Sequence, residues 1–431
     1  MNLAMTGINF RTAPLNIREK ISFSENQATK ILKYATQEFP ETEAATLSTC
    51  NRTELYIAGP YIEGKNDSFI NFLLKLNGLE KNKDIRKHFY FKEALDAAKH
   101  LLAVASSLDS MVVGETEILG QVKKAHALAL SVKTSGKVLN RLFQTAVRTG
   151  KKVHTETDIC RGCVSVSSIA VEFAEKVFDN LKSKRVMVVG AGEMSELTLK
   201  SLMKKGVKDI TILNRSLDKS NALAQRYNGQ AIDFELLENH LPHADIVISS
   251  TNAPHCVITA DLAKKSAAAR RGRPIFFIDI AVPRDIEEKA GTIDNVYLYN
   301  IDDLQKVAAT NLEKRQQSVD NAWKIINEEA IVFSKLAETI SHETLMKELT
   351  RFSDDVKETE LNRIFSKEEI NSIPEHYRKE IEEMAHRITK RILAMPRKTL
   401  AEAVKNGHWE KYSKLARSLF GFHKEKQDAN K

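Results

Sequence analysis

The stretch that most constrains the fold runs from Arg185 to Lys204. An apolar run, Arg185 to Val189, is followed at once by two closely spaced glycines and then by a helical segment. The glycines allow a tight turn and close approach of a pyrophosphate, while the helix N-terminus adds positive potential. Ser195 replaces the usual third glycine and is still small enough for close packing. The pattern predicts a dinucleotide site at Gly190, Ala191, Gly192, Glu193, Met194 and Ser195.

The next apolar run supports this prediction and indicates which cofactor binds. It spans Asp209 to Leu213 and ends in Asn214, Arg215 and Ser216. A guanidinium can pair with a 2′-phosphate, whereas the carboxylate usual in NAD sites would repel it, so the pattern favours NADPH. Further strands alternate with helices, which predicts a doubly wound parallel sheet. These strands span residues 244–250, 275–280 and 296–299.

Composition places the chain among soluble globular proteins. Of its 431 residues, 42% are apolar and 28% are charged, and no apolar run reaches the length needed to span a bilayer. The N-terminus lacks the features of a signal peptide, and four cysteines in 431 residues do not suggest a disulfide framework. We therefore expect a cytoplasmic protein with no membrane contact. The formal net charge of +8 is compatible with a polyanionic partner such as nucleic acid.

A single cysteine, Cys50, lies in a predicted turn between the apolar runs 44–47 and 55–58. A thiol attacks as thiolate, and a nearby cation such as Arg52 lowers its pKa. The neighbouring Thr49, Asn51 and Arg52 can also hold a polar, charged acyl group. The alternative is a small buried cysteine beside a hairpin, which is common in proteins.

Two further segments of residues 1–155 carry polar groups beside apolar ones. Glu93 to Ser106 has helical spacing and contains His100, which is either a boundary residue or a proton donor near Cys50. Ser106 to Gln121 packs hydroxyls, carboxylates and two glycines into 16 residues, as expected for a polar ligand site or for caps and a turn. Ser24 to Phe39 is predicted to be a helix that Ser24 caps and Pro40 ends.

The sequence contains no metal-ligand cluster. Cys160-Arg161-Gly162-Cys163 is a CxxC without a second ligand pair, and we interpret it as two incidental thiols, with a redox pair as the alternative. Glu115 and Glu117 are more typical of hydrogen-bonding carboxylates than of a divalent-ion site. We predict no metal.

The last third of the chain is predicted to be helical. Residues 302–336 have helical spacing but a polar middle, Glu313 to Ser318, which is typical of a helix that bridges domains. Residues 337–420 are expected to be helical with breaks at Pro374 and Pro396, and 421–431 to be a disordered tail. Met384 to Leu400 mixes apolar and basic residues, which fits either an oligomer face with basic flanks for RNA or an ordinary solvated helix.

Taken together, these motifs resemble the glutamyl-tRNA reductase family over nearly the whole chain. The resemblance rests on Gly7-Ile8-Asn9 with Thr12-Ala13-Pro14 and Arg18-Glu19, on residues 48–54 and 107–121, on Glu156-Thr157-Asp158-Ile159, on the nucleotide loop, and on Asp279-Ile280-Ala281-Val282-Pro283-Arg284.

The resemblance implies NADPH-dependent reduction of glutamyl-tRNA to glutamate-1-semialdehyde, the entry to tetrapyrrole synthesis by the five-carbon route. Cys50 matches the nucleophile that forms a thioester, and His100 matches a histidine needed for activity. Glutamate-binding positions match Thr49, Asn51, Arg52, Ser110, Glu115, Thr116, Glu117 and Gln121.

The resemblance also implies an α/β multidomain homodimer. The expected parts are a catalytic domain (1–155), a Rossmann-type NADPH domain (156–301), a spinal helix (302–336), an all-α dimerisation domain (337–420) and the tail (421–431). It leaves open whether the aldehyde passes directly to the downstream glutamate-1-semialdehyde aminotransferase as a protein partner.

Some positions depart from the family pattern, and two other functions compete. Phe10 stands where histidine is common, and Thr116-Glu117 stands where Pro-Gln is frequent. Cys160 and Cys163 replace small residues.

The first competing function is a dehydrogenase of a free small molecule, because the Asn214-Arg215-Ser216 strand end is similar to that of shikimate dehydrogenases. The second is a non-catalytic tRNA-binding protein.

Overall fold

The computed structural model describes residues 2–160, 166–251, 253–304, 316–367, 370 and 373–422, without the side chains of Val166 and Glu193. The chain forms two compact units, one of residues 3–330 and one of residues 331–431 with the first two residues. Arg161, Gly162, Cys163, Asn252 and the predicted tail from His423 lie outside the described residues, as do positions 305–315 of the predicted spinal helix. Among the described helices, none is long and apolar enough to cross a membrane.

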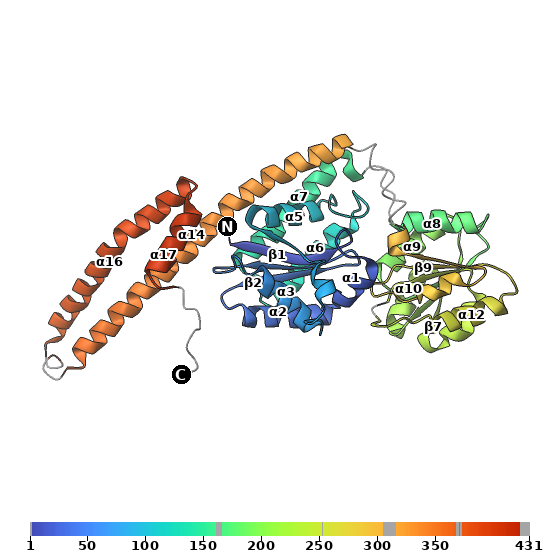
Figure 1. Cartoon of the computed structure of the whole chain (residues 1–431), viewed down its shortest axis with the longest axis horizontal. Coiled ribbons are helices and arrows are strands. Elements are labelled where there is room, and N and C mark those ends of the chain that lie inside the picture. Colours follow the sequence, from blue (N-terminus) through green and yellow to red (C-terminus); the bar gives the residue numbers. More distant parts are fainter. Residues whose placement is uncertain are drawn as a thin grey trace. The chain divides into compact units, whose positions relative to one another are not determined.

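The N-terminal part of the first unit is built on a four-stranded sheet in the order β2-β3-β1-β4, with every pairing antiparallel. Figure 1 shows α2 and α3 on one face of this sheet and α5 and α7 on the other. Its strands are β1 (Leu3–Asn9), β2 (Glu43–Ser48), β3 (Arg52–Ala58) and β4 (Tyr90–Glu93). Its helices are α1 (Leu15–Ile21), α2 (Glu25–Glu38), α3 (Asn66–Leu76), α4 (Lys83–Arg86), α5 (Ala94–Ala105), α6 (Glu117–Ser131) and α7 (Lys137–Glu156).

Local sequence signals account for the elements around Cys50. β2 and β3 pair from Glu43↔Ala58 to Ser48↔Thr53, so the three residues between them close a hairpin with Cys50 at its tip. Ser24 caps α2, as the sequence predicts, and it forms a reciprocal capping box with Gln27. The predicted helix around His100 forms as α5.

The nucleotide-binding part contains six parallel strands in the order β10-β9-β8-β5-β6-β7. Counted from β5 this is the order 6-5-4-1-2-3, the doubly wound arrangement of dinucleotide-binding domains. The strands are β5 (Arg185–Val189), β6 (Asp209–Asn214), β7 (Gln230–Asp233), β8 (Ile246–Ser249), β9 (Ile275–Asp279) and β10 (Val296–Asn300). The helices are α8 (Val166–Val177), α9 (Glu193–Lys204), α10 (Leu217–Tyr227), α11 (Leu237–His240) and α12 (Ala260–Ala269).

This sheet is covered on both faces. Val186 and Val188 of β5 belong to one hydrophobic core, while Met187 and Val189 belong to the other. Successive side chains of a strand point to opposite faces, so a strand buried on both sides is apolar throughout, as β5 is. The predicted fold class of this part is therefore confirmed.

The second unit is helical. Its elements are the C-terminal part of α14 (Gln316–Phe365), α16 (Glu375–Lys405) and α17 (Trp409–Leu419), and they pack around a small apolar core (Figure 1). That core contains Leu345, Leu349, Leu393, Leu400, Trp409 and Ala416. α16 leaves Met384, Ile388, Ile392 and Met395 exposed.

Two details of this helical region differ from the sequence prediction. α14 continues through position 336, where the predicted spinal helix ended, up to Phe365. The predicted break at Pro396 is wrong, because Pro396 lies inside α16, although α16 does begin after Pro374. Proline removes one backbone hydrogen bond and crowds the preceding turn, but Leu393 and Leu400 on either side of it are buried in the core. Packing thus outweighs the local cost.

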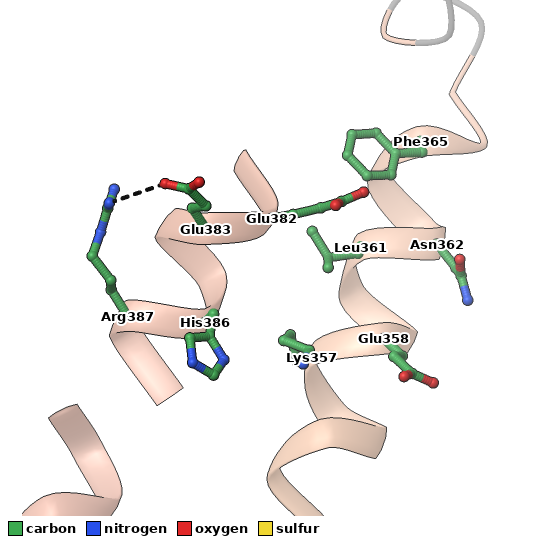
Figure 2. Close-up of a pocket in the computed structure, with 9 residues that line it drawn as sticks. All are labelled: Lys357, Glu358, Leu361, Asn362, Phe365, Glu382, Glu383, His386 and Arg387. Atoms are coloured by element: carbon green, nitrogen blue, oxygen red, sulfur yellow. Dashed lines mark ion pairs between the residues drawn. The ribbon is translucent and has the colours of Figure 1, made fainter. Parts of the chain in front are cut away.

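A cavity of about 640 Å³ lies between α14 and α16 in this unit. Figure 2 shows Leu361 and Phe365 pointing from α14 toward Glu382 on α16, and the ion pair between Glu383 and Arg387 along α16. The residues that line it include no thiol or hydroxyl nucleophile. The candidate nucleophile, Cys50, lies in the first unit.

Candidate active site

A small pocket surrounds Cys50 and gathers most of the residues that the sequence singled out. Its free volume is about 20 Å³, which holds about one water molecule. A substrate acyl group can therefore enter only if the lining side chains separate. The N-terminal part contributes Thr49, Cys50, Asn51, Arg52, Ser110, Glu115, Glu117, Ile118 and Gln121, and the nucleotide-binding part contributes Met194 and Ile301.

Two predicted site residues lie elsewhere. Thr116 is exposed at the N-terminus of α6, and its side chain makes no cap hydrogen bond. His100 does not line the pocket among the described residues; it lies behind Arg52 with Nε2 2.9 Å from Glu54 Oε1 and Nδ1 3.7 Å from Asp109 Oδ2. Any effect of His100 on the thiol would therefore pass through these carboxylates.

The Arg52 guanidinium interacts with a buried network of carboxylates rather than with the Cys50 thiol. Its Nη1 is 2.6 Å from Glu54 Oε1 and 3.3 Å from Asp109 Oδ2, and its Nη2 donates to the Asp109 carbonyl. Tyr56 and Tyr90 donate to the same Glu54 carboxylate. Burial alone would raise the pKa of Glu54, but Arg52 and His100 hold it well below its ordinary range. Alternate residues of a strand share a face, so Arg52, Glu54 and Tyr56 of β3 meet on one side of the sheet.

The prediction that Arg52 lowers the pKa of Cys50 is wrong in this structure. Burial, reinforced by the Glu115 carboxylate, raises the pKa of the Cys50 thiol to about 12. The cation that opposes these two effects is Arg18, a residue that the sequence reasoning used only as part of a motif. The strand geometry that turns Arg52 toward Glu54 explains why proximity in sequence misled the prediction.

Arg18 is almost completely buried and ties the cysteine hairpin to the nucleotide-binding part. Its Nη1 donates to the Cys50 carbonyl, its Nε donates to the Ala13 carbonyl at 3.2 Å, and its Nη2 is 2.5 Å from Asp302 Oδ1. A second contact joins the same two regions, because Glu19 Oε1 is 2.8 Å from Arg284 Nε. The consecutive Arg18 and Glu19 on α1 thus fix the cysteine loop relative to β9 and β10.

The electrostatics of Glu115 give a testable prediction. Burial and the neighbouring Glu117 raise the pKa of Glu115 to about 7. Above pH 7 its carboxylate disfavours the Cys50 thiolate, so Glu115→Gln should lower the thiol pKa and speed alkylation of Cys50 by iodoacetamide roughly three- to tenfold at pH 8. Below pH 7 the two proteins should converge, because wild-type Glu115 is then protonated.

The measurement is the alkylation rate of the Cys50 peptide, followed by mass spectrometry. Asp209→Asn, which removes an exposed carboxylate from the nucleotide-binding part, is the matched control. Equal rates for Glu115→Gln and wild type at pH 8 would contradict this electrostatic account.

The nucleotide loop has the backbone that the glycine pattern predicts. Gly190 has φ +93°, and a Cβ there would lie 2.4 Å from the Ser250 carbonyl oxygen. Gly192 precedes α9, and Ser195 is fully buried, which allows α9 to pack closely against the sheet. β5 and β8 are adjacent, and their carboxyl ends meet where the strand order reverses, the position at which such sheets bind nucleotides.

The second nucleotide-binding segment lies at the end of β6. Asn214 Nδ2 donates to the Ser216 carbonyl at 3.2 Å, which holds the turn. Arg215 is exposed, with its guanidinium 5.8 Å from the centre of the Phe234 ring. The loop and this exposed cation fit a dinucleotide whose phosphates face the ends of β5 and β6.

Two further predictions concern the CxxC segment and metal binding. Cys160 is half-buried, and Cys163 lies outside the described residues. Among the described residues, no three His, Cys, Asp or Glu side chains are grouped as metal ligands would be.

Comparison with known families agrees with this division of the chain. Residues 6–157 match the model of the glutamyl-tRNAGlu reductase N-terminal domain, residues 172–307 that of shikimate/quinate 5-dehydrogenase, and residues 321–422 that of the glutamyl-tRNAGlu reductase dimerisation domain. A dehydrogenase-type nucleotide domain whose helix α9 contributes Met194 to a cysteine pocket defines an NAD(P)-dependent oxidoreductase.

Full-length relatives narrow this class. A glutamyl-tRNA reductase of Pelotomaculum thermopropionicum is 39% identical over 97% of this chain and 94% of that protein, and one of Geotalea uraniireducens is 37% identical over 97% and 96%. The chain belongs to the glutamyl-tRNA reductase family. The solved glutamyl-tRNA reductase of Methanopyrus kandleri is 32% identical, with 94% and 99% of the two chains covered and a TM-score of 0.49.

Proposed function

We propose that this chain reduces glutamyl-tRNA to glutamate-1-semialdehyde with NADPH and releases tRNA, the first step of five-carbon 5-aminolevulinate synthesis. One observation carries the proposal: Cys50, at the tip of a hairpin, shares a pocket with Met194 from the first turn of the nucleotide-binding helix α9. A nucleophile and a hydride donor must meet at one carbonyl carbon, and this pocket is where the two parts of the chain meet.

The chemistry proceeds through a thioester on Cys50. The thiolate sulfur bonds to the ester carbonyl carbon, the bond to the ribose oxygen breaks, and that oxygen takes up a proton as tRNA leaves. Because sulfur donates less electron density to the carbonyl than oxygen does, the thioester is more easily reduced than the ester; covalent catalysis thus splits one hard step into two. NADPH, held by the loop from Gly190 to Ser195, would supply the hydride to the thioester carbonyl carbon, and expulsion of the Cys50 thiolate would then release the aldehyde.

The charges of the pocket suit the glutamyl group. This group carries an α-ammonium beside the reacting carbonyl and a carboxylate at the end of its side chain. Glu115 and Glu117 supply negative charge for the ammonium, and Arg52 supplies positive charge for the carboxylate. An ammonium near Glu115 would also reduce the effect of that carboxylate on the thiol, so substrate binding itself would favour the Cys50 thiolate.

Arg18 acts in this scheme as a positioning residue. Its contacts to the Cys50 carbonyl and to Asp302 hold the cysteine loop and bring positive charge toward the thiol without contacting the substrate. His100, held by Glu54 and Asp109, keeps the Arg52 network in place.

The function is tested by following NADPH absorbance with glutamyl-tRNA as substrate. Oxidation should require the charged tRNA and produce glutamate-1-semialdehyde. Oxidation with free hydroxy or oxo acids but not with glutamyl-tRNA would instead support a small-molecule dehydrogenase. Retention of tRNA on a filter with no NADPH oxidation would support a non-catalytic binding protein.

Cofactor choice gives a separate prediction at Arg215. An exposed guanidinium at the end of β6 can pair with the 2′-phosphate that distinguishes NADPH from NADH. Arg215→Glu should raise the KM for NADPH roughly 10- to 100-fold and change that for NADH far less. Lys219→Ala, which removes an exposed cation from α10, is the control. An unchanged KM for NADPH would show that the 2′-phosphate is held elsewhere.

We also propose a cytoplasmic homodimer and keep the domain limits 1–155, 156–301, 302–336 and 337–420. The dimerisation-domain match and the exposed stripe of Met384, Ile388, Ile392 and Met395 on α16 support the dimer.

We further propose that the aldehyde passes directly to the downstream aminotransferase, because direct transfer would protect a reactive product. In a coupled assay with both enzymes, an added trapping amine should then fail to intercept the aldehyde.

A further inference from the structure

The ester chemistry restricts where the end of the tRNA can lie. In an aminoacyl-tRNA the carbonyl that Cys50 attacks is bonded directly to the ribose of the 3′-terminal adenosine. That adenosine must therefore lie within one ribose of the Cys50 sulfur. If the proposed function holds, a surface next to the pocket must therefore hold a nucleoside.

The pocket is closed on one side and adjoins a groove on another, with Gln121 as their shared lining residue. Met194 and Ile301 of the nucleotide-binding part close the first side. Gln121 of α6 lines both the Cys50 pocket and a separate groove of about 470 Å³ between α2 and α6. We call this the α2–α6 groove. It is lined by Phe23, Glu25 and Ala28, by residues 46–48 of β2, and by Gln121, Lys124, Ala125, Ala127, Leu128 and Ser131 of α6. Its volume lies within the range of small-ligand sites.

The groove is held rigidly to the cysteine hairpin. It follows β2, which is the outer strand of the β2-β3-β1-β4 sheet. Ser48, two residues before Cys50, accepts a hydrogen bond at 3.1 Å from the Phe23 amide, so the segment that carries Phe23 is fixed to the strand that carries the nucleophile. A ligand in the groove would thus lie against the strand that leads to Cys50.

The side chains of the groove suit an adenosine with its 5′-phosphate. Phe23 is half-buried and offers an aromatic face, and Ala28, Ala125 and Leu128 give an apolar wall for a purine ring. Lys124 is exposed at the rim, where a phosphate would meet solvent. The backbone of an outer strand can pair with the edge of a base. We propose that the α2–α6 groove binds the 3′-terminal adenosine of glutamyl-tRNA, with Phe23 stacking on its base.

The proposal is tested with the full-length protein and two substrates, glutamyl-tRNA and 3′-O-glutamyl-adenosine. Phe23→Ala should raise KM about tenfold for both substrates and leave kcat nearly unchanged, because stacking is lost while the thiol is untouched. Phe23→Leu, which keeps an apolar side chain and so preserves packing, should show the same increase. Lys124→Ala should raise the KM for glutamyl-tRNA alone, since glutamyl-adenosine has no phosphate.

Tyr34→Ala, which removes an exposed aromatic ring from the same helix α2, is the matched control and should leave both KM values unchanged. Wild-type KM values for both Phe23 variants would overturn the proposal. An increase in KM for glutamyl-tRNA but not for glutamyl-adenosine in the Phe23 variants would also overturn it, because the groove would then hold another part of the tRNA. Failure of the proposed function is distinguishable, since wild-type protein would then turn over neither substrate.

Discussion

A Cys50→Ser protein is expected to reduce glutamyl-tRNA roughly 10⁴-fold or more slowly than wild type. Serine places a far weaker nucleophile at the hairpin tip, and an acyl-serine would be another oxoester with no gain in electrophilicity. The change is nearly isosteric in a half-buried position, so the fold should be kept. NADPH oxidation and aldehyde formation measure the effect.

The control for this variant is Cys160→Ser, which removes another half-buried thiol. It should retain wild-type turnover, and NADPH binding should be unchanged in both proteins. Turnover near the wild-type rate in Cys50→Ser would end the proposal of a covalent intermediate, because hydride would then reach the ester directly.

Removal of the Arg52 guanidinium is expected to have the largest effect on stability. Arg52→Met leaves the Glu54 carboxylate buried without its cation, and losing one partner of a buried pair costs about 3–5 kcal/mol. The catalytic part should melt at a lower temperature, and glutamyl-tRNA turnover should be lost. Thermal unfolding followed by circular dichroism measures the first effect.

A double variant separates the structural role of Arg52 from its proposed contact with substrate. Arg52→Met combined with Glu54→Gln removes both charges, so much of the stability should return. If Arg52 also binds the substrate carboxylate, turnover should stay low in this restabilised protein. Recovered turnover would show that Arg52 serves only the buried network, and an unchanged melting temperature in Arg52→Met would contradict the network itself.

Features that depend on neighbouring residues could be predicted from the sequence. Adjacent residues predict the helix cap at Ser24, the cysteine hairpin and the strand–loop–helix at Gly190. The structure contains each of these features. The short strands β4 and β7 were not foreseen, because four residues are too few to show a period.

Features that depend on distant residues could not be predicted. Arg18 meets Asp302 across 284 positions, and no local signal joins them. The pKa of Cys50 was predicted in the wrong direction, because burial and Glu115 act on the thiol only after the chain has folded. Pro396 stays helical for a similar reason, since the core around Leu393 and Leu400 forms from other helices.

The sulfur of Cys50 is proposed to take the glutamyl group from tRNA before any reduction occurs. Mass spectrometry of the protein after incubation with glutamyl-tRNA, with no NADPH present, tests this directly. The account predicts a glutamyl adduct on the Cys50 peptide that is lost when NADPH is added. An unmodified Cys50 peptide under conditions in which added NADPH still gives full turnover would contradict it.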